Sequence, residues 1–273
     1  MIKGAGSVRG IGPFSLAVDT VGEAMPDTPA IPAATLILVR DGADGPPDLL
    51  MVERAATMAF AAGAMVFPGG RVDADDRLLG AQVRGPHGAA RVAAVRETLE
   101  ETAVPVGLDP IPSPDLARTL QQALLAEAPF SELLASHGLR LDVGDLILFA
   151  HWLPKFHASR RFDTLFFIDM APPGAWHPTV GERENASAEW LSAAEALRRD
   201  AAGEASLIFP TRCTLQRLAQ HGGFAAMRGD AARHPVETIT PWIEEVDGEK
   251  MLAIPDHLGF PVIRAPLDGL SRG

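Results

Sequence analysis

The residues of this chain that are best suited to binding or catalysis are three closely spaced glutamates, Glu97, Glu100 and Glu101. Positions i, i+3 and i+4 of an α-helix lie on one face, so the three carboxylates would gather along a single stripe. Like charges in this arrangement repel one another by roughly a few tenths of a kcal/mol per pair on an isolated helix. A solvated acidic helix face is the ordinary interpretation of the pattern, and its surroundings must decide whether it does more.

Two features of the surroundings favour a functional site. Arg96 directly precedes Glu97, and a guanidinium group orients nearby carboxylates through a fork of hydrogen bonds. Upstream, residues 67–70 (Phe-Pro-Gly-Gly) end a short apolar run. A glycine pair lets the backbone approach a ligand or a metal ion closely, because it carries no side chains. The acidic helix and the glycine turn together predict a ligand site.

These two segments resemble the Nudix box. In that motif a glycine is followed after five residues by a glutamate, and after seven more by Arg-Glu-apolar-X-Glu-Glu-X-Gly-apolar. Gly70 takes the place of the glycine, and residues 96–104 take the helical half. Three positions depart from the motif: Asp76 stands at the first glutamate, Thr98 at an apolar position and Ala103 at the late glycine.

The box is also interrupted. Residues 77–95 separate Asp76 from Arg96, where the motif has seven residues. Extra length in a loop costs little free energy, and it leaves the spacing of the glutamates within the helix unchanged. A branch of the Nudix family has such an interrupted box, and it includes a peroxisomal coenzyme A diphosphatase. The resemblance covers about residues 33–200, with further local matches at residues 151–154, 160–167 and 189–191.

The resemblance implies a metal site with bound Mg²⁺ or Mn²⁺. Its ligands would be the three carboxylates and a backbone carbonyl, from Glu97, Glu100, Glu101 and Gly69. Hard oxygen ligands suit these ions, which keep some water and are completed by phosphate oxygens of a substrate. The resemblance also implies catalytic roles for Glu97, Glu101 and Arg96.

Members of the family often add a further carboxylate from a later loop, as a metal ligand or general base. Glu184 takes that place, six residues before the tryptophan of Glu189-Trp190. Glu182 is a close competitor, and a merely solvated loop glutamate is an equally weighted alternative.

The substrate expected from the resemblance is a nucleoside diphosphate derivative. Residues 49–55 and 63–70 resemble a segment of coenzyme A-cleaving members, with Arg54 in register and Ala59 in place of a second arginine. Coenzyme A or acyl-CoA therefore comes first, and ADP-ribose or NADH-like compounds are the alternative. Arg54, Arg161 and Gly70 are the expected substrate-binding residues, although Arg161 also fits a solvated strand entry.

The elements that must position these residues alternate between strands and helices without a regular βαβ rhythm. This pattern predicts an α+β fold, and the resemblance implies a Nudix-like α/β/α sandwich with a mixed sheet. We expect an N-terminal arm over residues 1–32, a Nudix domain over 33–200 with a helical insertion at about 106–144, and a C-terminal extension over 201–273. The elements expected are strands at 34–40, 49–54, 64–67, 145–153, 161–170 and 188–191, helices at 86–104, 115–137 in two pieces, 192–199 and 211–220, and a hairpin at 239–254 turning at Asp247-Gly248.

The charge, the cysteine count and the hydropathy of the chain argue against several other classes of function. The formal net charge of −11 argues against a nucleic-acid binder, which needs a basic surface for phosphates. The single cysteine, Cys213, excludes an intramolecular disulfide and favours a reducing cytoplasm. No apolar run approaches the roughly 20 residues of a transmembrane helix. We therefore expect a cytoplasmic protein without a membrane or nucleic-acid partner, with a homodimer as an open alternative.

Two other function classes stay open. A non-catalytic Nudix-fold module that binds a nucleotide and regulates a partner predicts damage to the glutamates, which are intact. An unrelated α/β protein with a fortuitous acidic helix would leave the glycine turn and Glu189-Trp190 as coincidences. The chain has no Gly-X-Ser-X-Gly elbow and no Walker phosphate loop, which disfavours serine hydrolases and P-loop enzymes.

Overall fold

A central mixed sheet organises the computed structural model, which describes residues 29–42, 45–56, 61–154, 161–181 and 185–267. Within these ranges the sheet has eight strands in the order β10-β7-β8-β1-β2-β3, with β4 paired to β1 and β9 paired to β2. β1 runs parallel to β8 and antiparallel to β2 and β4. The strands are β1 (Ile31–Arg40), β2 (Asp48–Arg54), β3 (Met65–Val66), β4 (Gly69–Arg71), β7 (Ile147–Trp152), β8 (Phe162–Met170), β9 (Asn185–Ser192) and β10 (Thr238–Ile239).

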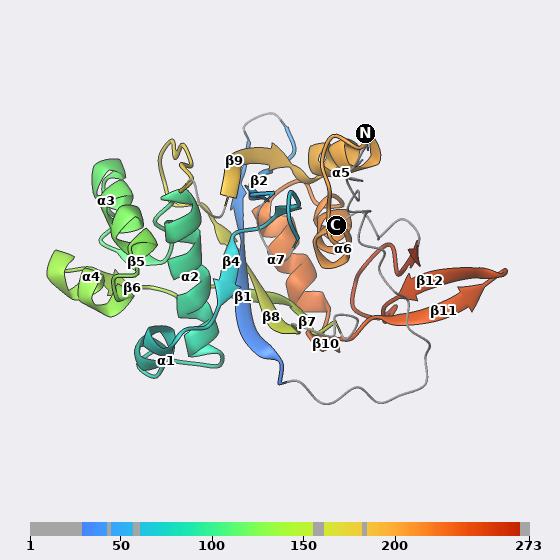
Figure 1. Ribbon diagram of the computed structural model, residues 1–273, viewed down its shortest axis with the longest axis horizontal. Coiled ribbons are helices and arrows are strands. Elements are labelled where there is room, and N and C mark those ends of the chain that lie inside the picture. Colours follow the sequence, from blue (N-terminus) through green and yellow to red (C-terminus); the bar gives the residue numbers. More distant parts are fainter. Residues whose placement is uncertain (1–28, 43–44, 57–60, 155–160, 182–184, 268–273) are drawn as a thin grey trace, which may run out of the picture.

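Helices cover both faces of this sheet, which gives three layers (Figure 1). One layer holds α1 (Ala74–Gly80), α2 (Gly88–Thr102), α3 (Pro114–Leu125) and α4 (Phe130–His137). The opposite layer holds α5 (Ala193–Ala201), α6 (Phe209–Leu218) and α7 (Phe224–Arg233). The predicted α+β sandwich with a mixed sheet is confirmed. No helix of the described ranges is long and apolar enough to cross a bilayer.

Strand β1 shows how the sheet builds two hydrophobic cores. Successive side chains of a strand point to opposite faces. Leu36 and Leu38 enter the cluster under α2, whereas Ile37 and Val39 enter the cluster under α6. All four are fully buried, and each contributes about 1.5–3 kcal/mol of hydrophobic stabilisation. β1 is therefore an apolar run without alternation, as expected of a strand covered on both faces.

The predicted core face of helix α2 is confirmed, and residues of the helix outside that face are buried as well. Val92, Val95 and Leu99 are fully buried in the cluster against the sheet. Thr98, which stands at an apolar position of the motif, is also fully buried, and its hydroxyl donates to the Ala94 carbonyl at 2.7 Å. This bond satisfies the hydroxyl within its own helix, so a threonine can replace an apolar residue there.

The interruption of the motif contains the end of one helix and the start of another. The helix α1 ends at Gly80, and α2 begins at Gly88, so residues 77–95 span both and the turn between them. A Cβ on Gly80 would lie 2.3 Å from the Ala89 backbone nitrogen. Glycine at this position therefore lets the two helices pack directly against each other.

The remaining sequence predictions meet two corrections. The predicted hairpin forms between β11 (Trp242–Val246) and β12 (Glu249–Ala253), with left-handed backbone at Asp247 and Gly248. The predicted strand over 239–246, however, is split at Pro241, because β10 pairs with β7 and β11 pairs with β12. Helices α1 and α7 were not predicted, and neither were four short strands: β4 (Gly69–Arg71), β5 (Leu108–Asp109), β6 (Arg140–Leu141) and β13 (Arg264–Pro266).

The single cysteine provides a probe of this core. Cys213 lies on α6 and is almost fully buried, and burial raises the pKa of its thiol to about 12. Because the thiolate is the reactive form, only about one molecule in ten thousand is reactive at pH 8. We expect Ellman's reagent to label the native protein at pH 8 at least about a hundredfold more slowly than the protein in 6 M guanidinium chloride. Equal labelling rates in the two conditions would contradict the packing of α6.

Candidate active site

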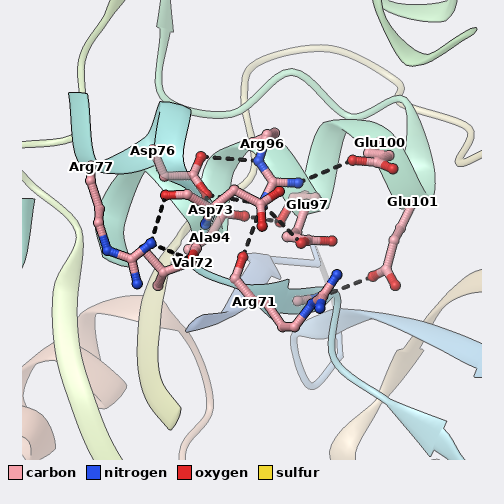
Figure 2. A network of polar contacts seen from close by, with 12 residues as sticks. Arg71, Val72, Asp73, Asp76, Arg77, Ala94, Arg96, Glu97, Glu100 and Glu101 are labelled. Atoms are coloured by element: carbon pink, nitrogen blue, oxygen red, sulfur yellow. Dashed lines mark hydrogen bonds and ion pairs between the residues drawn. The ribbon is translucent and has the colours of Figure 1, made fainter. Parts of the chain in front are cut away.

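The site is organised around Arg96, which points from α2 between α1 and β4 (Figure 2). The Arg96 guanidinium is nearly buried and donates to both carboxylate oxygens of Asp76, from Nε at 3.0 Å and from Nη2 at 2.9 Å. Asp76 is fully buried. Burial alone lowers the pKa of Arg96, but the hydrogen bond with Asp76 and the charges of Glu97 and Asp76 outweigh it and raise that pKa. This paired geometry satisfies two buried charges that would be costly apart.

The same guanidinium holds two of the three predicted carboxylates. Nη2 of Arg96 donates to Glu97 Oε1 at 3.0 Å and to the Arg71 carbonyl of β4 at 3.0 Å. Nη1 donates to Glu100 Oε2 at 3.1 Å. Arg96 therefore fixes the carboxylates of its own helix relative to β4 and α1, as the sequence predicted for a fork of hydrogen bonds.

The third carboxylate is held by the glycine turn. Glu101 Oε2 accepts a hydrogen bond from the Gly69 amide at 3.0 Å. A Cβ on Gly69 would lie 2.4 Å from the Ala34 carbonyl oxygen, and one on Gly70 would lie 2.3 Å from Glu97 Oε1. The contact at Gly69 is with backbone and leaves no space for a side chain, whereas a side chain at Gly70 would require the Glu97 carboxylate to move. The glycine pair and the acidic helix are thus in direct contact, as one shared site would require.

The carboxylates act on one another electrostatically. The pKa of Glu97 is raised to about 8: burial raises it most, the charge of Arg96 lowers it, and the charges of Glu101 and Glu100 raise it. In a site of low dielectric, several carboxylates that share one guanidinium leave excess negative charge. A cation close to the three glutamates would relieve this repulsion and favour the ionised form of Glu97.

The donor set suits a hard divalent cation. The oxygen groups of this region include the carboxylates of Glu97, Glu100 and Glu101 and the backbone carbonyl of Gly69, and oxygen ligands are those that Mg²⁺ and Mn²⁺ prefer. Within the described ranges, however, no three His, Cys, Asp or Glu side chains are gathered tightly enough to form a metal cluster. The carboxylates instead bond to Arg96 and Gly69. Binding a metal ion would therefore require small rotations of these side chains.

The other predicted residues lie at the edges of this region. Arg54 ends β2, and its backbone exchanges hydrogen bonds with Gly63 and Ala64. Arg161 precedes β8, is partly buried, and its carbonyl accepts from the Ile31 amide at 2.7 Å. Glu184, its competitor Glu182, and Ala59 lie outside the described residues.

A residue that the sequence analysis missed connects the helical insertion to the site. Gln121 of α3 is almost fully buried, and its Nε2 donates to the Glu100 carbonyl at 3.1 Å and to the Thr179 carbonyl at 2.6 Å. Its Oε1 accepts from Thr179 Oγ1 at 3.0 Å, and the Thr179 amide donates to the Thr102 carbonyl at 2.9 Å. One side chain thus ties residues 171–181 to the end of α2.

A sequence signal for this residue was available. Gln121 shares its helix face with Ala117, Leu120 and Leu124, which are spaced as the apolar stripe of an amphipathic helix and are all buried. A polar residue in such a stripe must find hydrogen-bond partners in the interior. Gln121 lies in the apolar stripe and its neighbour Gln122 does not. This difference predicts that Gln121, and not Gln122, makes buried hydrogen bonds.

The fold and the site together define a class of protein, an α/β/α sandwich with a carboxylate-bearing helix packed on a glycine strand. No family profile matches the chain. Acyl-coenzyme A diphosphatase NUDT19 of Gallus gallus is 26% identical over 262 residues, which cover 73% of this chain and 68% of the relative. The putative nudix hydrolase 7 of Caenorhabditis elegans is 27% identical over 178 residues, covering 63% of this chain and 56% of that relative. The chain thus spans little more than half of the second relative.

A solved structure extends the comparison to the fold. The NUDIX hydrolase from Alicyclobacillus acidocaldarius superposes with a TM-score of 0.63 at 29% sequence identity, over 74% of this chain and 96% of that chain. These likenesses in sequence and in fold are to proteins named as Nudix hydrolases, in agreement with the resemblance expected from residues 70 and 96–104.

The buried ion pair predicts a large effect on stability. Asp76→Asn removes the charge that neutralises Arg96 and turns an N–H group toward the arginine, so we expect a loss of about 3–5 kcal/mol in the free energy of unfolding. Asp48→Asn is the matched control, because the Arg40–Asp48 pair is well exposed and such pairs contribute about 0–1 kcal/mol. Denaturation by urea measures both changes. Equal losses in the two variants would contradict the role given to Asp76.

The glycine contact predicts an effect on metal binding with little effect on the fold. Gly70→Ala places a Cβ against the Glu97 carboxylate, which is the movable end of its side chain, so the carboxylate must turn away. We expect Mn²⁺ affinity to fall by about 10–100-fold, as when the groups that orient metal ligands are changed, with a melting temperature within a few degrees of wild type. Gly45→Ala, where a Cβ meets nothing within 4 Å, should change neither. Calorimetric titration with MnCl₂ makes the measurement.

Proposed function

We propose that this chain is a Mg²⁺- or Mn²⁺-dependent diphosphatase that hydrolyses the diphosphate linkage of a nucleoside diphosphate derivative. The observation that carries the proposal is the intact set of three carboxylates on α2, held by Arg96 and Gly69 at a strand that leaves no room for other side chains. A module that only binds nucleotides has no need to keep all three. Similarity to proteins named as Nudix hydrolases supports the same conclusion.

In this proposal Glu97, Glu100, Glu101 and the Gly69 carbonyl would hold the metal. When bound, the ion would polarise a phosphoryl group, activate a water molecule and neutralise charge on the leaving phosphate. Arg96 keeps the Glu97 and Glu100 carboxylates in place, and Asp76 keeps Arg96 in place. Because Arg96 is hydrogen-bonded to several carboxylates of the protein, we assign it the role of positioning these carboxylates.

The remaining assignments rest on the sequence resemblance. Glu184 is proposed as the general base that takes a proton from the attacking water, with Glu182 as the alternative. Arg54 and Arg161 are proposed to bind phosphate oxygens of the substrate, and Gly70 to let it approach the backbone. The buried thiol of Cys213 is compatible with the reducing cytoplasm that we propose as the compartment.

Coenzyme A and acyl-CoA are the substrates that we place first. The support is the chicken relative, which is named an acyl-coenzyme A diphosphatase, and the register of Arg54 in the upstream segment. ADP-ribose or NADH-like compounds are the second candidate. They are favoured by Ala59, which stands where the resemblance has an arginine and cannot supply a cation for a further phosphate.

A panel of diphosphate compounds tests the proposal. Coenzyme A, acetyl-CoA, ADP-ribose and NADH are incubated with the protein in Mg²⁺ or Mn²⁺, and the products are identified by mass. We expect cleavage between the two phosphorus atoms of at least one compound, and its abolition by EDTA. Binding of a panel member without cleavage would instead favour a nucleotide-binding regulator.

The glutamates predict the strongest loss of activity. Glu97→Gln and Glu101→Gln each remove a charge and an anionic ligand while keeping the side-chain shape. We expect each change to abolish metal-dependent hydrolysis, exceeding the roughly 100-fold effect of changes outside the ligand set. Glu245→Gln, on the exposed strand β11, is the control and should keep wild-type kcat. Turnover in both ligand variants at the wild-type rate would refute the assignment.

A further inference from the structure

A β-bulge at the start of β9 changes the direction of one side chain near the site. β9 pairs with β2, with Glu53 opposite Ser187 and Arg54 opposite Asn185, so Ala186 is the extra residue of the bulge. Such bulges locally reverse the alternation of a strand and are frequent next to active sites, where they redirect a side chain. The bulge decides the face of the sheet to which Asn185 belongs.

The face follows from the pairing. Leu191 of β9 is opposite Leu49, and both lie in the cluster under α6. With regular alternation Asn185 would share that face, because it is an even number of residues from Leu191. The bulge instead pairs it with Arg54, which by the alternation of β2 shares its face with Leu50, in the cluster under α2. Asn185 is therefore turned to the face that carries the glutamates.

The two paired side chains both carry a buried polar atom without a partner. Asn185 is only 3% exposed, and its Oδ1 makes no hydrogen bond to any residue that the structure describes. The same holds for Nε of Arg54. An acceptor and a donor thus lie on neighbouring strands, both hidden from water, and no residue that the structure describes satisfies either of them.

Such atoms are expensive to keep. Burying a polar atom without a hydrogen bond destabilises the folded state, and most proteins avoid it. In a site that recognises its substrate by hydrogen bonds, such an atom has a function. An acceptor that only the substrate satisfies discriminates strongly against ligands that cannot donate to it. Asn185 begins β9 and Arg54 ends β2, so the two lie at paired strand ends on the sheet face that α2 covers, which agrees with such a role.

We propose that Asn185 is a substrate-contacting residue that determines specificity. Its Oδ1 accepts a hydrogen bond from a hydroxyl or amide group of the bound nucleoside diphosphate derivative, while Arg54 Nε donates to an adjacent anionic oxygen of the same molecule. The proposal rests on the proposed function for the nature of the ligand. It concerns the part of the substrate away from the bond that is broken, so its effect is on binding.

The test is the replacement of Asn185 by leucine, which has nearly the same shape but no acceptor. Because Oδ1 makes no bond to the described residues, we expect an unchanged or higher melting temperature. For hydrolysis of coenzyme A or ADP-ribose with Mg²⁺, KM should rise about tenfold or more, the loss expected for one hydrogen bond to a charged or polar group. The value of kcat should stay within about threefold, since the contact is the same in the ground and transition states.

Thr214→Val is the matched control. The Thr214 hydroxyl is also fully buried and without a partner among the described residues, but it lies on α6 in the opposite layer. We expect the melting temperature to be unchanged or higher, as for Asn185→Leu, with no change in KM. Asn185→Ala serves as the second variant if the leucine variant does not fold, and the same rise in KM is expected.

The outcomes separate the inference from the proposed function. A lower melting temperature of Asn185→Leu with wild-type KM would show that Asn185 only supports the fold, and would overturn the inference. If the wild-type protein hydrolyses neither compound, calorimetric titration with coenzyme A and ADP-ribose replaces kinetics. Binding that is weakened in Asn185→Leu then supports the inference although the proposed function fails. Equal affinity in the two proteins, or no binding to the wild type, overturns it.

Discussion

The buried pair of Arg96 and Asp76 is the interaction on which the site depends. It joins α2 to α1 through two hydrogen bonds to one carboxylate, and the same guanidinium reaches β4 through the Arg71 carbonyl. An isolated buried charge would be costly in this interior, so both partners must be present and correctly oriented. Once they are, the remaining N–H groups of Arg96 point at Glu97 and Glu100. The carboxylates are therefore placed by the packing of three elements, and not by the helix alone.

The interruption of the motif is tolerated for the same reason. Asp76 and Arg96 are far apart in the sequence, but α1 folds back on α2, and the two helices touch at Gly80 and Ala89. The contact depends on the packing of the helices and not on the length of the chain between them. An aspartate is shorter than the glutamate of the motif, and direct packing of α1 against α2 is compatible with that shorter reach. The loop can accordingly lengthen without moving any ligand.

Much of this arrangement could be predicted from the sequence, because it depends on short-range periodicity. The spacing of Glu97, Glu100 and Glu101 predicted the correct helix, and the glycine pair at 69–70 contacts it, although the two glycines begin a separate short strand, β4, and do not follow a strand end. The contributions that arise from long-range packing could not be predicted in this way. The break between β10 and β11 follows from Pro241, which has no N–H for a ladder, but the pairing of β10 with β7 is a property of the whole sheet. The bulge at Ala186 has no distinctive residue, and only the register of β9 against β2 shows where Asn185 points.

The two parts of the site resolve the cost of buried polar groups in different ways. At Arg96 the protein itself supplies the hydrogen-bond partners, since the guanidinium bonds to the carboxylates of Asp76, Glu97 and Glu100. One guanidinium does not balance the charge of several carboxylates, and the excess negative charge favours binding of a cation. At Asn185 and Arg54 the described protein supplies no partner for one atom of each residue. The first arrangement is rigid, and it suits groups that must keep one geometry throughout a reaction. The second is open, and it suits groups that must distinguish one ligand from another. A hydrolase that cleaves one linkage common to many nucleotides needs both, since the linkage itself carries no information about the rest of the molecule.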